Sequence, residues 1–255
     1  MKHLFSLEGR VALITGGSRG IGRMIATGFL KQGAKVYITA RKVPACDAAA
    51  QELAQFGDCL SLPADVSTVD GAQKLARSFA EREAQLDILV HNAGAAWVAE
   101  FDAFTESGWD KVVDLNMKTP FFLTQALHAQ LAKSGTQRCA KVINIASIDG
   151  LSVNALETYS YAASKAGLIH LTRRMALRLI SDNIVVSCIA PGTFPSDMNR
   201  EARDQPGISA GRVPAGRVGN EDDIAGAAVF LASRAGDYVV GETLTVDGGW
   251  TLVRG

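Results

Sequence analysis

Short apolar runs alternate with longer helix-like segments along almost the whole chain. The strand-like runs are residues 10–15, 35–40, 59–63, 86–90, 141–146, 184–190 and 243–246. The helix-like segments are residues 21–30, 44–56, 67–84, 109–132, 158–180 and 220–233. Strands separated by helices pair in parallel through crossover connections, which cover both faces of a sheet. The pattern therefore predicts an α/β fold built on one doubly wound parallel sheet of seven strands.

The sequence contains no sign of a boundary between domains. No linker, low-complexity tract or internal repeat divides the 255 residues, and 47% of them are hydrophobic. This predicts one domain over residues 1–255. Residues 191–219 are irregular, contain four prolines and follow the end of a predicted strand. A loop of that length is usually functional, so we expect a substrate lid there.

Charge and composition exclude several classes of partner. Lys and Arg total 26, as do Asp and Glu, so no net field favours nucleic acid or an anionic membrane. The first ten residues have no apolar run typical of a signal sequence, and no later segment is an uninterrupted membrane span. We expect a soluble, cytoplasmic protein. Four scattered cysteines and four histidines without ligand spacing predict reduced thiols and no metal site.

A glycine loop separates the first predicted strand from the first helix. Residues 15–22 read TGGSRGIG, which matches neither G-x-G-x-x-G nor the Walker loop. The spacing G-x-x-x-G-x-G still lets a pyrophosphate approach the helix N-terminus, where free N–H groups favour an anion. The alternative is a purely structural turn between strand and helix.

The end of the second strand indicates which dinucleotide the loop would hold. NAD sites usually place an acid there, whereas NADP sites supply a cation for the 2′-phosphate. Here residues 38–42 read ITARK, and the first acid after them is Asp47. Arg41 and Arg19 could clamp a phosphate, because guanidinium matches phosphate oxygens bidentately. This predicts NADP(H); the alternative is two solvated arginines.

One helical segment carries a candidate proton donor. Residues 159–165 read YSYAASK, and residues four apart share a helix face, so Tyr161 rather than Tyr159 faces Lys165. A nearby ammonium would lower the pKa of the Tyr161 phenol and prepare it as an acid. The alternative is a tyrosine that packs on a core beside a solvated lysine.

These features occur together in one known family. The chain contains TGxxxGIG at 15–22, NAG at 92–94, Asn116, Ser147, YxxxK at 161–165, PG at 191–192 and DGG at 247–249. In this order they resemble the short-chain dehydrogenase/reductase superfamily over essentially the whole chain. The resemblance implies a single Rossmann-type domain and a homotetramer or homodimer that reduces or oxidises small molecules.

The resemblance also implies roles for individual residues. Tyr161 would be the general acid, Lys165 would bind the nicotinamide ribose, Ser147 would hold the carbonyl oxygen and Asn116 would support a water relay. The implied cofactor contacts are Gly16, Ser18, Arg19, Ile21, Arg41, Asp65, Val66, Asn92, Ala93, Gly94, Tyr161, Lys165, Pro191, Gly192, Phe194 and Ser196. From the sequence alone, Asp65 could instead be a helix cap.

Several positions depart from the family pattern. His91 stands where the family usually has Asn, and we expect it to be structural. Ser147 and Tyr161 are one residue further apart than usual, and loop 148–157 would have to absorb the insertion. Ser196 replaces a common Thr and can supply the same hydroxyl. The Phe194-Pro195 pair is less usual and affects the lid conformation.

The predicted activity is transfer of a hydride from NADPH to a ketone. The chain looks most similar to 3-oxoacyl-[acyl-carrier-protein] reductases, including the branch that feeds β-hydroxyacyl chains into lipid products such as rhamnolipids. Another carbonyl or alcohol, such as a sugar, steroid or small diketone, is the alternative substrate. A cofactor-binding regulator without turnover is the other class. Some apolar residues of the lid and of the loop after the fourth strand could contact an acyl chain or a ring, or could belong to an ordinary core. They are Trp97, Phe194, Met198, Ile208 and Val213.

Overall fold

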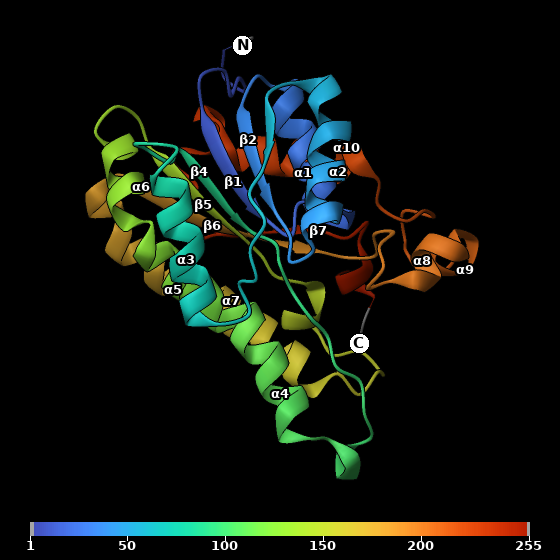
Figure 1. Ribbon diagram of the computed structural model, residues 1–255. Helices are drawn as coiled ribbons and strands as arrows, with labels where there is room; N and C mark the ends of the chain where they lie inside the picture. The colour runs from blue at the N-terminus through green and yellow to red at the C-terminus, as the bar shows by residue number, and fades with distance from the viewer. Residues whose placement is uncertain (1–2, 254–255) are drawn as a thin grey trace.

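The computed structural model describes residues 3–253, whose strands form one parallel sheet (Figure 1). The strands are β1 (Val11–Thr15), β2 (Lys35–Thr39), β3 (Cys59–Ser61), β4 (Ile88–His91), β5 (Ala140–Ile145), β6 (Ile184–Pro191) and β7 (Thr243–Val246). Their order is β3-β2-β1-β4-β5-β6-β7, and every pairing is parallel. The predicted doubly wound sheet is therefore confirmed. Its winding direction reverses between β1 and β4, which is where such sheets bind ligands.

Helices cover both faces of the sheet (Figure 1). One face carries α1 (Gly20–Lys31), α2 (Val43–Leu53) and α10 (Glu221–Ala232). The other carries α3 (Val69–Ala80), α5 (Thr119–Ala126), α6 (His128–Gly135) and α7 (Tyr159–Leu179). The remaining helix of this half, α4 (Glu106–Val113), packs on α7. No helix among residues 3–253 combines the length and apolarity needed to cross a bilayer.

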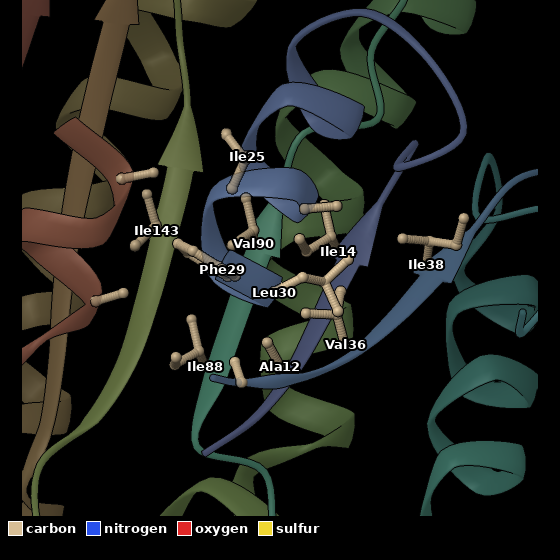
Figure 2. Close-up of a cluster of buried hydrophobic side chains, with 14 of the residues drawn as sticks. Ala12, Ile14, Ile25, Phe29, Leu30, Val36, Ile38, Ile88, Val90 and Ile143 are labelled. Atoms are coloured by element: carbon tan, nitrogen blue, oxygen red, sulfur yellow. The ribbon is translucent and has the colours of Figure 1, made fainter. Parts of the chain in front are cut away.

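Two hydrophobic clusters hold these layers together. Alternate residues of a strand point to opposite faces, so Ala12 and Ile14 join the cluster under α1, while Leu13 joins the one under α3. Figure 2 shows the first cluster, in which Ile25 and Phe29 of α1 lie over the strand side chains. Full burial of such side chains stabilises the fold by about 1.5–3 kcal/mol each. The glycine loop is thus anchored on both sides by packed elements.

The segment 109–132, predicted as one helix, is not one helix. It divides into the end of α4, a π-helical turn (Asp114–Lys118), α5 and α6, with a break at Leu127. Pro120 in the first turn of α5 has no N–H to donate, which is tolerated only near a helix start. The lid also gains two short helices, α8 (Arg200–Asp204) and α9 (Pro206–Ala210), within an otherwise irregular segment.

Candidate active site

The glycine loop after β1 is fastened to the loop after β4. The Thr15 hydroxyl accepts hydrogen bonds from the backbone N–H groups of Asn92 and Ala93, both at 3.0 Å. The Asn92 amide in turn donates to the carbonyl oxygens of Thr15 (3.0 Å) and Gly16 (3.1 Å). Asn92 therefore shapes the loop, and Gly94 lies two residues further along the same edge.

The glycines of this loop are required by close approaches. A Cβ on Gly22 would lie 2.3 Å from the Asn92 Nδ2 atom and 2.4 Å from the Gly16 carbonyl oxygen. A Cβ on Gly17 would lie 2.7 Å from the Ile38 side chain. Helix α1 begins at Gly20 with no side-chain cap and no acid in its first turn, so its first N–H groups remain available to an anion. The residues present fit a dinucleotide pyrophosphate.

The two arginines predicted to clamp a phosphate lie at the same sheet edge. Thr15 and Thr39 are paired at the ends of β1 and β2, and Arg19 and Arg41 follow them. Arg41 is exposed. The guanidinium of Arg19 instead forms an ion pair with Asp197 of the lid. The structure therefore does not bring the two arginines onto one partner, and the clamp stays a prediction.

Asp65 and Val66 follow β3, as predicted for an adenine contact. Asp65 is exposed, and its carboxylate accepts a hydrogen bond from the Ser67 N–H at 3.0 Å. The alternative in which Asp65 caps the next helix is wrong, because Thr68 caps α3 by accepting from Gly71. Val66 is buried, and its carbonyl accepts from the Thr119 hydroxyl.

Tyr161 and Ser147 meet at the carboxyl edge of the sheet. Ser147 follows the end of β5, and its hydroxyl hydrogen-bonds to the Tyr161 phenol, which lowers the pKa of Tyr161. The extra residue between them is absorbed by a 3-10 turn (Ile148–Gly150) and the turn after it, so the insertion does not separate the pair. Tyr159, by contrast, packs edge-on against the rings of Phe101 (5.7 Å) and Phe104 (5.5 Å).

The acidity of Tyr161 differs from the sequence prediction. Burial raises the pKa of Tyr161 to about 12, opposed by the hydrogen bond from Ser147 and reinforced by the charge of Asp149. The predicted lowering by Lys165 is wrong for this state. The Lys165 ammonium donates to the Ile145 carbonyl at 2.7 Å and lies 5.6 Å from the centre of the Tyr161 ring. Tyr161 remains a protonated phenol.

Lys165 is itself perturbed by its surroundings. It is 5% exposed, and burial lowers the pKa of its ammonium from 10.5 to about 8. A Cβ on Gly94 would lie 3.2 Å from the Asn116 side-chain oxygen and 3.8 Å from the Lys165 nitrogen. The absence of a side chain at Gly94 therefore lets the loop after β4 lie close to both Asn116 and Lys165.

Asn116 reaches the site from the π-helical turn. Its side-chain oxygen accepts from the Ala95 N–H at 2.8 Å, and its NH₂ donates to the Ala95 carbonyl at 2.9 Å and to the Ser164 hydroxyl at 3.0 Å. The side chain thus joins the β4 loop to α7. The predicted water relay from Asn116 to Lys165 stays a prediction. Such wide turns often occur at functional sites.

Sequence reasoning missed three supports of this arrangement. Ser164 hydrogen-bonds Asn116, and the Ile145 carbonyl holds Lys165. Gly150 allows the Ser147 loop to approach α7, because a Cβ there would lie 2.7 Å from the Lys165 backbone. A glycine within the lengthened loop was the available signal for the last of these; a backbone carbonyl leaves no sequence signal.

His91 and the lid residues fall into distinct environments. His91 is buried, contacts the Thr124 hydroxyl at 2.8 Å and has a pKa lowered to about 3 by burial, so it is neutral and consistent with the structural role expected. Phe194 packs in the core against Gly219, and its predicted cofactor contact stays a prediction. Met198 and Ile208 are exposed, Val213 is buried, and Trp97 packs on Gly108.

The Pro191 to Ser196 segment runs from the end of β6 over the glycine loop. A Cβ on Gly192 would lie 2.7 Å from the Asp247 backbone, which explains the glycine. The Ser196 side chain lies next to Gly20 and accepts from the Asn199 N–H at 3.1 Å. The predicted cofactor residues Gly16, Ser18, Ile21, Asn92, Ala93 and Gly94 thus share one edge with Pro191, Gly192 and Ser196.

Comparisons with known proteins agree with this arrangement. Residues 16–251 match the family described as enoyl-(acyl carrier protein) reductase. The chain is 44% identical to the rhamnolipids biosynthesis 3-oxoacyl-[acyl-carrier-protein] reductase of Pseudomonas aeruginosa, over 99% of this chain and 100% of that one. It is 38% identical to the 2-dehydro-3-deoxy-D-gluconate 5-dehydrogenase of Escherichia coli (strain K12), over 96% and 97% of the two chains. A solved Pseudomonas aeruginosa RhlG/NADP active-site complex superposes with a TM-score of 0.95 at 44% identity, over 98% of this chain and 100% of that one.

Proposed function

The chain belongs to the short-chain dehydrogenase/reductase superfamily, and on this premise we propose that it reduces the ketone of a 3-oxoacyl thioester with NADPH. The observation that carries the proposal is the hydrogen-bonded pair of Ser147 and Tyr161, with Tyr161 held as a protonated phenol. Reduction of a carbonyl needs a proton donor at oxygen, and a protonated phenol supplies one. The match to an NADP complex and to a 3-oxoacyl reductase supports cofactor and substrate.

NADPH, when bound, supplies the hydride for the carbonyl carbon. The first N–H groups of α1 would hold its pyrophosphate, and Lys165 would donate hydrogen bonds to its nicotinamide ribose. Ser147 donates a hydrogen bond to the substrate oxygen, and Tyr161 gives that oxygen its proton. Asn116 acts through position, because it ties the β4 loop to α7. The hydroxyacyl product then leaves beneath the lid, at about residues 191–219. Residues 1–255 form a single catalytic domain in this proposal.

A substrate panel tests the function directly. NADPH consumption is measured with 3-oxoacyl thioesters, enoyl thioesters, keto-sugars and small diketones. We expect the highest kcat/KM for 3-oxoacyl thioesters, with a 3-hydroxyacyl product. A higher value for a keto-sugar would favour the sugar-acid alternative suggested by the gluconate 5-dehydrogenase relative. No turnover of any member, with NADPH bound, would favour the regulator.

The cofactor preference forms a separate prediction. Arg41 is exposed at the end of β2, where no acid can hold ribose hydroxyls. Arg41→Ala should weaken NADPH binding by about 10- to 150-fold, since charge-assisted hydrogen bonds contribute about 1.5–3 kcal/mol, and should leave NADH binding unchanged. Fluorescence titration of both nucleotides measures this. The neighbouring exposed Lys42→Ala is the control, and an equal loss in the two variants would contradict a specific role for Arg41.

The buried ammonium of Lys165 predicts a dependence on pH. Its pKa is lowered to about 8, so it is charged below that pH and loses its proton as pH rises through it. We expect the affinity for NADPH to fall above pH about 8. Titration of the Tyr161→Phe variant with NADPH across pH separates Lys165 from Tyr161. A fall in affinity that is caused by Lys165 persists when the Tyr161 phenol is absent. Constant affinity up to pH 9.5 would rule out Lys165 as the group.

Assembly and location are also proposed. The family resemblance suggests a cytoplasmic homotetramer, or else a homodimer, and exposed apolar side chains near the carboxyl end of the described chain support association: Tyr238, Val240, Leu252 and Val253. Light scattering should give about four times the mass of one 27.0 kDa chain. A monomer at micromolar concentration would contradict the proposal.

A further inference from the structure

We propose that Asp197 fastens the lid to the glycine loop in the cofactor-free protein and competes with the adenosine 2′-phosphate for Arg19. The inference rests on the proposed use of NADP(H). It gives the Asp197 carboxylate a part in cofactor selection. The argument uses residues that contact each other in the structure.

The carboxylate of Asp197 bridges two arginines. One of its oxygens pairs with Arg19 of the glycine loop, and the other with Arg203 of α8. Arg203 also forms two hydrogen bonds to Asp204, at 2.8 and 3.0 Å, and so belongs to the lid itself. The contact between Asp197 and Arg19, which are 178 residues apart in sequence, is therefore the one that links lid and loop.

The lid lies directly on the start of α1. A Cβ on Gly20 would lie 3.3 Å from the Ser196 side chain, the neighbour of Asp197. Arg19 and Gly20 line a cavity of about 310 Å³ together with Pro195, Ser196 and Asp197. Asp197 thus stands beside the helix N-terminus that is expected to receive the pyrophosphate, rather than at a remote part of the surface.

Arg19 pairs with Asp197 through its Nη1 atom. A 2′-phosphate that binds the guanidinium bidentately through this same Nη1 takes the donor from Asp197 and so displaces the carboxylate. The displacement is feasible because the pair is well solvated, with Arg19 73% and Asp197 45% exposed. NADH has no 2′-phosphate and leaves the pair intact. The carboxylate therefore opposes NADPH binding more strongly than NADH binding, because only NADPH has to take Arg19 from it.

Asp197→Asn tests this competition by nucleotide titration without turnover. We expect the Kd for NADPH to fall about two- to fivefold, in keeping with an exposed ion pair, and the Kd for NADH to change less. Asp204→Asn is the matched control, because it removes an equal lid charge that pairs with Arg203 and not with Arg19. Equal effects of the two variants on NADPH would overturn the proposal, since they would reflect only the general field of the lid.

The Arg19→Ala background separates this inference from the proposed function. Asp197→Asn should change nothing there, while Arg19→Ala alone should weaken NADPH binding. If Arg19→Ala has no effect, the phosphate clamp fails; if it weakens binding but Asp197→Asn does not strengthen it, only the competition fails. In the cofactor-free protein, amide exchange of residues 194–199 should be faster in Asp197→Asn than in the wild type, and unchanged exchange would contradict the fastening.

Discussion

Tyr161→Phe should reduce kcat for ketone reduction by about 10²- to 10⁴-fold, the usual contribution of a positioned general acid. The phenol is the protonated group that hydrogen-bonds Ser147, and burial raises its pKa to about 12, so it carries its proton at every working pH. Phe keeps the ring and its packing beside Lys165. The Kd for NADPH should therefore change little, and a stopped-flow measurement of hydride transfer gives the loss directly.

Tyr159→Phe is the matched control on the same turn of α7. The Tyr159 ring packs on Phe101 and Phe104 and is 38% exposed, so removal of its hydroxyl leaves the packing unchanged. We expect kcat within about twofold of the wild type, since surface changes of this kind are usually small. A large loss in Tyr159→Phe with activity kept in Tyr161→Phe would reverse the assignment of the acid.

Gly22→Ala should have the second largest effect, on both stability and cofactor binding. The added methyl would lie 2.3 Å from Asn92 Nδ2 and 2.4 Å from the Gly16 carbonyl, and neither can move without opening the glycine loop. Overpacking of this kind costs about 1–3 kcal/mol of unfolding free energy. Loss of aligned N–H donors to a phosphate should weaken NADPH binding by about 10- to 100-fold.

Gly226→Ala in α10 is its control. No atom lies within 4 Å of a Cβ at Gly226, and the residue is exposed in the middle of a helix that packs on α1. Alanine should stabilise the protein there by about 0.5–1 kcal/mol through helix propensity. Thermal melts and NADPH titrations of both variants make the comparison. Normal NADPH affinity in a folded Gly22→Ala protein would show that the close approach does not shape the cofactor site.

The sheet could be predicted because most strands are short runs rich in apolar and β-branched residues, and because glycines follow several of them. The single tyrosine facing Lys165 also followed from helix spacing alone. The π-helical turn was not predicted from the sequence; it joins α4, which packs on α7, to α5, which packs on α3. The pKa of Tyr161 depends on burial, on Ser147 and on the charge of Asp149, which only the folded structure brings together.

Other parts depend on contacts between distant residues. The glycine loop was recognised from its spacing, but the hydrogen bonds between Thr15 and Asn92 that hold it join residues 77 positions apart. Likewise, the partner of Arg19 lies in the lid and had no signal near the glycine loop. Sequence reasoning identified the groups that carry charge. It could not say which of them neutralise each other in the absence of a ligand.

The π-helical turn at Asp114–Lys118 has a consequence for how this chain can evolve. Loss of one residue there would restore regular winding and rotate α5 by about 100° relative to α4. All catalytic side chains could remain in such a deletion variant, yet α4 and α5 could no longer both face their partner helices. A length change at this position should therefore destabilise the fold even when every side chain of the site is kept. The position of Asn116 and the packing of α4 and α5 then depend on the same turn.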